Sequence, residues 1–239
     1  MRFIYFTILF CFLWAGSKTL NAEETVQIVT ADLPPYSIEV GMRPGIIVEI
    51  IQAINDRIDI HSPVEFYPWS RAQLMAKSSE NYIIFPLMRT KDRENQYDWA
   101  IDVMPLEMVF VTLGGQKLTI AQAKKMNIVT VQQSTPFAEF LKKQNFKNFH
   151  PSTQPSDQHF NMLRRHRADT WLTSKALADY MADKYHLKKS VLLSEPIANG
   201  HIYIAFSKKF PPSLRQRYIE TYQNLKEDGT ISYILSQYR

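Results

Sequence analysis

The chain has 239 residues, of which 45% are hydrophobic, and its formal net charge is +5. That length and apolar content allow a full core in one domain or two small lobes, and exclude a small scaffold that needs disulfides to fold. The basic excess is mild and scattered, which disfavours nucleic acid binding, because such proteins gather their cations on one face with aromatic platforms.

The first 22 residues, MRFIYFTILFCFLWAGSKTLNA, have the layout of a secretory signal peptide, with an early arginine, an apolar run and a small residue at Ala22. The run is short for a membrane span, which needs roughly 20 apolar residues, although an uncleaved anchor stays the alternative. Cleavage after Ala22 removes Arg2 and Lys18 and leaves a net charge of +3. The sequence therefore predicts an exported protein that starts at Glu23.

The chain's only cysteine, Cys11, lies in that leader, in a context that does not match a lipoprotein signal. The mature chain is then expected to contain no disulfide, thiolate nucleophile or cysteine metal site. Export without disulfides favours the bacterial periplasm.

Strand-like and helix-like segments alternate along the first half of the mature chain. Residues 25–31 are β-branched and alternate, which predicts a strand. From Gly45, helical spacing relates six isoleucines, at positions 46, 47, 50, 51, 54 and 58. Residues 63–69 are expected to be a strand running into a loop, and 70–80 a helix with Ser70 as its N-cap. Two further strands are predicted at 81–88 and 104–113.

The second half repeats the alternation. Helices are expected at 118–126, 134–144, 155–168 and 174–185, and the second of them opens after Ser134 or Thr135. Strands are expected at 127–133, 169–173, 190–196 and 201–210, and a short strand or a loop at 148–153. Two amphipathic helices, broken at Asp228-Gly229, end the chain. This order predicts an α/β fold with largely parallel sheets, arranged as two small lobes and not as one large sheet.

Four motifs fall in a fixed order: TADLPPYS (30–37), YPWSRA (67–72), MRTKDRE (88–94) and NLKEDGTISYILSQY (224–238). Together they resemble the bacterial solute-binding proteins of family 3, the polar amino acid type. The resemblance implies a two-lobed, type II periplasmic-binding-protein clamp. One lobe comprises 23–109 and 198–239, and 110–197 form the inserted lobe. Two strands, near Phe110-Val111 and Ile197-Ala198, are expected to form the hinge. The protein is expected to be a monomer that works with an ABC permease or a membrane sensor.

Arg93 matches the position that holds the ligand carboxylate in this family. A planar guanidinium donates two parallel hydrogen bonds to a carboxylate. The alternative is a surface arginine paired with Asp92 or Glu94. The resemblance also places Met88 and Thr90 at the ligand, by a backbone group and a hydroxyl.

Aromatic residues complete the expected site on the first lobe. Tyr36 matches a ring that covers the ligand, and Trp69 is expected to act similarly. Arg71 either adds a second positive charge or forms a salt bridge beneath the site.

In the inserted lobe, Ser134 and Thr135 match a helix N-terminus that faces the ligand, where they either bind it or cap the helix. Pro136 stands where the family often has glycine, so one backbone donor is lost.

Thr173 and Ser174 match the segment that carries an aspartate for the ligand's ammonium in amino acid binders. Neither is acidic, although Asp157 or Glu195 can supply a carboxylate from a neighbouring loop. We therefore expect the site to take an anion lacking an α-amino group, with Ser174 among its contacts.

Motifs typical of enzymes are missing from the sequence: there is no G-x-S-x-G, H-E-x-x-H, Walker loop or glycine-rich dinucleotide motif. The six histidines show no metal-ligand spacing and are expected on the surface, so no cofactor is predicted. Two alternatives remain beside transport: a periplasmic sensor, or a dehydratase acting on cyclohexadienyl acids.

Overall fold

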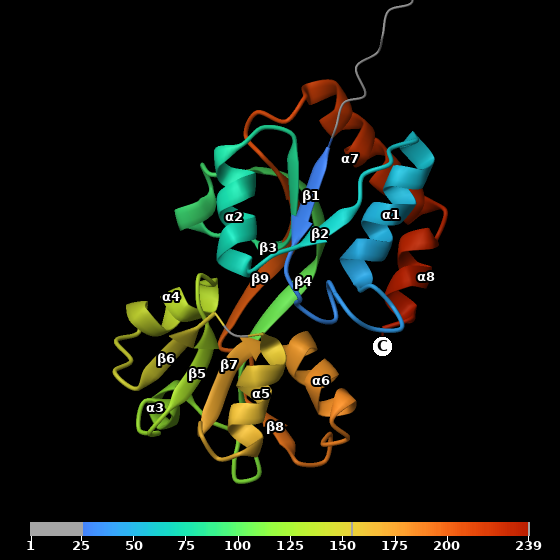
Figure 1. Ribbon diagram of the computed structural model, residues 1–239. Helices are drawn as coiled ribbons and strands as arrows, with labels where there is room; N and C mark the ends of the chain where they lie inside the picture. Colours follow the sequence, from blue (N-terminus) through green and yellow to red (C-terminus); the bar gives the residue numbers. More distant parts are fainter. Residues whose placement is uncertain (1–25, 154, 239) are drawn as a thin grey trace, which may run out of the picture.

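The computed structural model describes residues 26–153 and 155–238, which form two lobes joined by two long strands (Figure 1). The predicted leader and its cleavage site at Ala22 lie outside the described residues. Among the residues that are described, no helix is both long and apolar enough to cross a bilayer.

The first lobe is built on three short strands and four helices. Its strands are β1 (Gln27–Thr30), β2 (Val64–Phe66) and β3 (Tyr82–Met88). Its helices are α1 (Ile46–Ile58), α2 (Trp69–Ser78), α7 (Pro212–Glu227) and α8 (Thr230–Ser236), and a 3-10 turn, η1 (Lys91–Arg93), follows β3.

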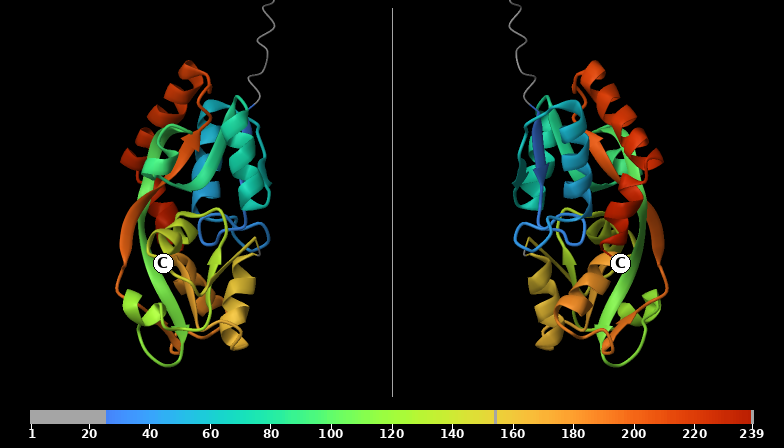
Figure 2. Two further views of the ribbon diagram at one scale, coloured as in Figure 1. Left: turned by 90° about the vertical axis from the view of Figure 1, so that its left-hand side faces the viewer. Right: turned by 90° about the vertical axis from the view of Figure 1, so that its right-hand side faces the viewer.

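The second lobe has the strands β5 (Val129–Gln132), β6 (Phe149–Ser152), β7 (Thr170–Ser174) and β8 (Val191–Leu193). Its helices are α3 (Ile120–Ala123), α4 (Pro136–Lys143), α5 (Ser156–Arg164) and α6 (Lys175–Lys184). The strands β4 (Asp98–Leu113) and β9 (Ala198–Phe206) run side by side along one side of the molecule and connect the lobes (Figure 2).

The strands of the two lobes belong to one hydrogen-bonded sheet, so the expectation of no single large sheet was wrong. The strand order is β2-β1-β3-β9-β4-β7-β5-β6, with β8 paired to β4. One end of β4 pairs with β9 and the other with β7 and β8, which carries the sheet across the hinge. Pairing is parallel within each lobe, between β1 and its two neighbours and between β5 and its two neighbours, and antiparallel around β4 and β9. Strand β4 continues through position 110 without interruption, so the secondary structure does not mark a lobe boundary there. The predicted lobe boundaries therefore stay a prediction.

The core of the first lobe forms around α1. All six predicted isoleucines of this helix are buried against β strands and α7, as the helical spacing predicted. The helix begins after Gly45, whose φ is 104°. A Cβ atom there would lie 2.7 Å from the Cα atom of Ser37, so the turn from β1 into α1 requires glycine.

Two local predictions were wrong. Ser70 does not cap α2, because the helix begins at Trp69 and the carbonyl of Pro68 already accepts from the backbone N–H of Arg71 and Ala72. His159 is not on the surface: it is buried, with its Nδ1 atom 2.6 Å from the Thr130 hydroxyl and its ring stacked on Trp171.

Candidate functional site

A cleft lies between the lobes, beside the two connecting strands. Its walls come from both lobes and from the two connecting strands. The first lobe contributes Leu33, Tyr36, Trp69, Pro86, Met88 and Arg93; β4 and β9 contribute Leu106 and Ile202; the second lobe contributes Gln132, Thr135, Pro136, Phe137, Leu172, Thr173, Ser174 and Leu177. Most of these side chains are apolar, so the cleft suits a ligand with an apolar body.

Arg93 is the one charged side chain among the described residues that line this cleft. Its guanidinium donates to the Gln73 side-chain oxygen at 2.7 Å, to the Ser134 carbonyl at 3.0 Å and, more weakly, to the Met88 carbonyl at 3.4 Å. Those partners are all neutral. Burial lowers the pKa of Arg93 from its usual range, and the more distant charges of Tyr97 and Glu139 oppose that effect. The site therefore holds a partly buried cation without a bound carboxylate.

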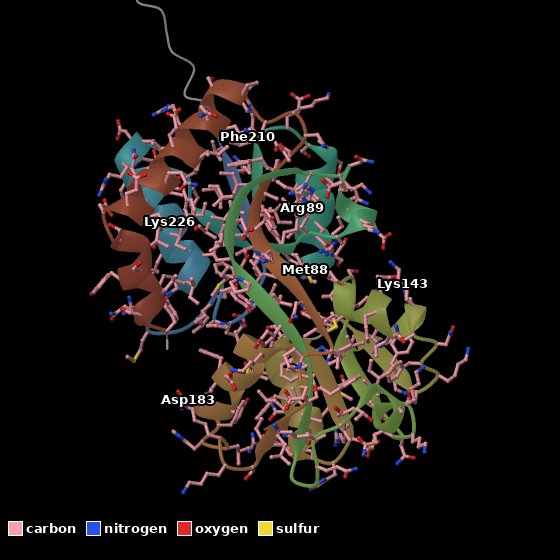
Figure 3. The ribbon with its side chains drawn as sticks, turned by 180° about the vertical axis from the view of Figure 1, so that it is seen from behind. Met88, Arg89, Lys143, Asp183, Phe210 and Lys226 are labelled. Carbon is pink, nitrogen blue, oxygen red and sulfur yellow. The ribbon has the colours of Figure 1, made fainter. Side chains whose placement is uncertain are left out.

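The position of Arg93 follows from the turn after β3. Strand β3 ends at Met88, and the 3-10 turn η1 then places Arg93 within hydrogen-bonding distance of Gln73 in α2. Arg89, four residues earlier, lies away from the cleft: its guanidinium pairs with Glu94 at the surface, as near as 2.5 Å, over the rings of Trp99 and Tyr203. Figure 3 shows Met88 close to the point where the connecting strands enter the second lobe, with Arg89 farther into the first lobe.

Tyr36 joins the two lobes across the cleft. Its hydroxyl donates to the Ser174 hydroxyl at 3.4 Å, and its ring is buried. Burial raises the pKa of Tyr36 to about 12, so the phenol stays neutral in the physiological range. Ser174 also caps α6 by accepting from the backbone N–H of Leu177.

Six of the nine predicted site residues line the cleft: Tyr36, Trp69, Met88, Arg93, Thr135 and Ser174. Three do not. Arg71 is exposed, with its guanidinium 4.8 Å from the centroid of the Tyr67 ring. Thr90 provides a backbone carbonyl to the N–H of Arg93. Ser134 turns its carbonyl, not its hydroxyl, toward Arg93 and Gln73, and its φ of 60° makes that orientation possible.

Thr135 is placed as a helix cap. Its hydroxyl donates to the Gln132 carbonyl at 2.7 Å and accepts from the Ala138 backbone N–H at 3.3 Å. Both hydrogen bonds of the hydroxyl are made within the second lobe, without a ligand. This arrangement corresponds to the second of the two roles that the sequence allowed, capping of the helix.

The carboxylates suggested as counterparts for an ammonium group are engaged elsewhere. Asp157 binds Lys184 and Tyr185, and Glu195 lies 3.3 Å from Lys117 at the surface. Neither lines the cleft, and no aspartate or glutamate of the described chain does.

Sequence reasoning missed most of the apolar lining and Gln73, which orients Arg93. Leu33 follows β1, and Pro86 and Leu172 lie among the last three residues of β3 and β7, positions that tend to approach a cleft in an α/β fold. No sequence signal identifies Leu106 and Ile202 as cleft residues, because their place in the lining depends on how β4 and β9 pair as they pass from one lobe to the other.

The chain is similar in structure to proteins of known fold. The ligand-binding core of GluR0 from Nostoc punctiforme, in complex with L-glutamate, matches with a TM-score of 0.79 at 16% identity, over 89% of this chain and 98% of that one. The arginine-, lysine-, histidine-binding protein ArtJ from Geobacillus stearothermophilus matches with a TM-score of 0.79 at 17% identity, over 90% and 94%.

A histidine kinase sensor domain described as similar to periplasmic binding proteins matches equally, with a TM-score of 0.79 at 16% identity over 90% and 95%. No protein-family model and no curated protein sequence matches the chain. At these identities the likeness establishes the fold, so the predicted two-lobed, periplasmic-binding-protein-like architecture is confirmed.

Proposed function

We propose that this chain, which has the fold of the periplasmic binding proteins, is an exported solute-binding protein whose lobes close around a small ligand. Similar structures bind amino acids, by their descriptions, and ArtJ binds arginine, lysine and histidine. A binding role is favoured over catalysis because the cleft lining offers no carboxyl group or histidine as a general acid, and burial, which raises the pKa of the Tyr36 phenol to about 12, makes that group a weak proton donor. Delivery to a membrane permease is part of the proposal.

The ligand that the cleft favours is a carboxylate with an apolar body and no α-amino group. The observation that carries this is the chemistry of Arg93: a partly buried guanidinium with neutral partners, in a lining that contains no acid among the described residues. A carboxylate would neutralise the positive charge of Arg93 and accept charge-assisted hydrogen bonds from its guanidinium. An ammonium group would have to give up its water for hydroxyl and carbonyl oxygens without a counter-charge.

Matched pairs of compounds test this preference. 3-Phenylpropanoate and 4-methylpentanoate differ from phenylalanine and leucine only in lacking the α-amino group. We expect the two deaminated acids to raise the melting temperature of the protein, and the two amino acids to leave it unchanged, since a ligand at a hundredfold excess over Kd stabilises by about 2.7 kcal/mol. Micromolar binding of glutamine, arginine or histidine by calorimetry would contradict the proposal.

Arg93→Gln should abolish that ligand response. Removing the charged partner of a buried carboxylate costs roughly 2–5 kcal/mol, which corresponds to at least about thirtyfold weaker binding. The ligand-free variant should melt no lower than the original protein, because it no longer buries a charge. Arg89→Gln is the matched control: it removes a surface guanidinium four residues away and should keep the full ligand response. Equal losses in both variants would exclude Arg93 as the anchor.

A further inference from the structure

The two lobes carry charges of opposite sign. The predicted second lobe, residues 110–197, contains 13 Lys and Arg against 6 Asp and Glu. The rest of the described chain, 26–109 and 198–238, contains 12 against 15. The mild net charge of the whole chain therefore conceals a basic lobe and an acidic one, an asymmetry that points to an anionic partner for the second lobe.

Part of this excess collects on cations that have no acidic partner. Besides Lys147, six exposed residues of the second lobe form no ion pair with a carboxylate within the described chain: Lys124, Lys125, Arg164, Arg165, Arg167 and Lys189. We call these six the distal basic surface. The acids nearby are occupied: Asp157 pairs with Lys184, and Asp183 with Lys188. Asp169 accepts from the backbone N–H groups of Asn127 and Ile128.

Local contacts hold these segments together at one end of the lobe. The Asp169 carboxylate binds the loop after α3 to the loop after α5, at 2.7 Å to the Asn127 nitrogen. The Arg164 guanidinium lies 4.6 Å from the centroid of the Tyr185 ring, at the end of α6. The backbone N–H of Gly114 donates to the Ser190 carbonyl, which joins the turn after β4 to the loop before β8.

This end is opposite the ligand cleft. Strands β5 and β7 are parallel, and their last residues, Gln132 and Ser174, line the cleft. Their first residues, Val129 and Thr170, follow the loops that carry the distal basic surface. In Figure 1 these loops lie in the lower part of the second lobe, at the end away from the first lobe.

The chemistry of the surface favours a lipid headgroup layer over a folded protein. Protein interfaces are usually anchored by buried aromatic or apolar side chains. The large exposed hydrophobic residues of the described chain, Val40, Met42, Leu74 and Tyr233, all lie in the first lobe. A set of exposed cations on several segments, without an apolar anchor, suits a partner whose charges can rearrange to meet them.

We propose that the distal basic surface docks the protein on membranes that contain anionic phospholipids. Each Lys or Arg near such a surface adds attraction that fades within a Debye length. The acidic first lobe is repelled, so the molecule stands on its second lobe and the cleft faces away from the bilayer. This surface goes beyond ligand binding and does not depend on which ligand the cleft takes.

Vesicle sedimentation tests the proposal. The purified chain is mixed with vesicles of phosphatidylcholine and phosphatidylglycerol at about 70:30, and separately with phosphatidylcholine alone, which measures any attachment through apolar segments, including the predicted leader. We expect binding to the anionic vesicles at low salt and its loss at about 0.5 M salt, where the Debye length is only a few ångströms. Equal binding to both vesicle types would overturn the proposal.

Charge variants locate the surface. Replacing Arg164, Arg165 and Arg167 together by Gln should lower the partition coefficient at least about tenfold. The matched control replaces three exposed first-lobe lysines without ion pairs, Lys77, Lys208 and Lys226, by Gln, and should change it less than about twofold. An equal fall in both would show a response to net charge alone and would reject the surface.

A second, independent variant guards against misfolding. Lys124→Gln with Lys125→Gln touches a different loop and should also weaken binding while the melting temperature is retained. Binding of polyglutamate or DNA without any binding of anionic vesicles would assign the surface to another class of partner and overturn the membrane proposal.

Discussion

At the residue scale, the side chain of Met88, which lines the cleft, packs against Gly200 in the connecting strand β9. Met88 lines the cleft at the end of β3, and Gly200 lies in β9, one of the connecting strands. A Cβ atom at Gly200 would lie 2.4 Å from the Met88 Cε methyl, which is closer than carbon atoms approach. Met88 is flexible enough to move, and the space available to it lies in the cleft.

Gly200→Ala should therefore weaken ligand binding while the protein stays folded. Overpacking of this kind costs typically 1–3 kcal/mol, so we expect about tenfold weaker binding of 3-phenylpropanoate by calorimetry. Adding Met88→Ala should restore affinity by removing the methyl that was displaced. Asn199→Ala, at the exposed neighbouring position, serves as the control. Unchanged affinity in Gly200→Ala would show that Met88 moves somewhere other than the cleft.

At the scale of secondary structure elements, the turn between α7 and α8 depends on one carboxylate. Asp228 accepts from the backbone N–H and the hydroxyl of Thr230 and from Arg57, while Gly229 takes a φ of 86°. The hydroxyl and backbone donors of Thr230, followed by Arg57, hold the pKa of Asp228 down at about 2. The sequence predicted this break between helices, because Asp-Gly favours such a turn.

The sign of the resulting pH dependence is fixed by that lowered pKa. A carboxyl whose folded pKa lies below its unfolded value stabilises the folded state above the unfolded pKa, and that contribution disappears as the pH falls toward about 2. Asp228→Asn should therefore lower the melting temperature near pH 7, by about 2–4 °C or less because the site is exposed. Melting curves recorded from pH 7 to pH 2 should converge for the two proteins. A constant gap across that range would assign the effect to the hydrogen bonds and not to the charge.

The sequence predicted the positions of helices and strands better than the orientations of individual side chains. Apolar periodicity located α1 and the strand pattern located β3, because burial alone dictates those spacings. The orientation of Ser134 could not be predicted, since few residues other than glycine take a positive φ and nothing in the local sequence requires it. Arg71 was misplaced for a related reason: α2 begins before Ser70, and the arginine then faces Tyr67 outside the cleft.

At the scale of the whole molecule, the cleft exists because the two lobes lie closed on each other. The contacts that join them span the sequence: Tyr36 to Ser174, Arg93 and Gln73 to the Ser134 carbonyl, and Asp92 to Lys143 at 2.6 Å. Apart from the Asp92–Lys143 pair, these contacts are partly or fully buried. Both members of that pair are largely exposed, so it contributes little to holding the lobes together. Closure therefore depends mainly on contacts that a ligand at Arg93 would share.

Spin labels at positions 92 and 143 can follow this closure directly. Asp92→Cys and Lys143→Cys place one label on each lobe at exposed sites, and Cys11 in the predicted leader is first replaced by Ser so that no other thiol reacts. We expect pulsed electron resonance to give a long and a short distance without ligand, and mainly the short one with saturating 3-phenylpropanoate, because hinge closure brings the labels together. Moving from equal populations to about 99:1 requires roughly a hundredfold preference of the ligand for the closed form. Adding Arg93→Gln should leave both distances in place at the same ligand concentration. A single unchanging distance in every sample would mean that the lobes do not part, and ligand entry would then need a path that the hinge does not provide.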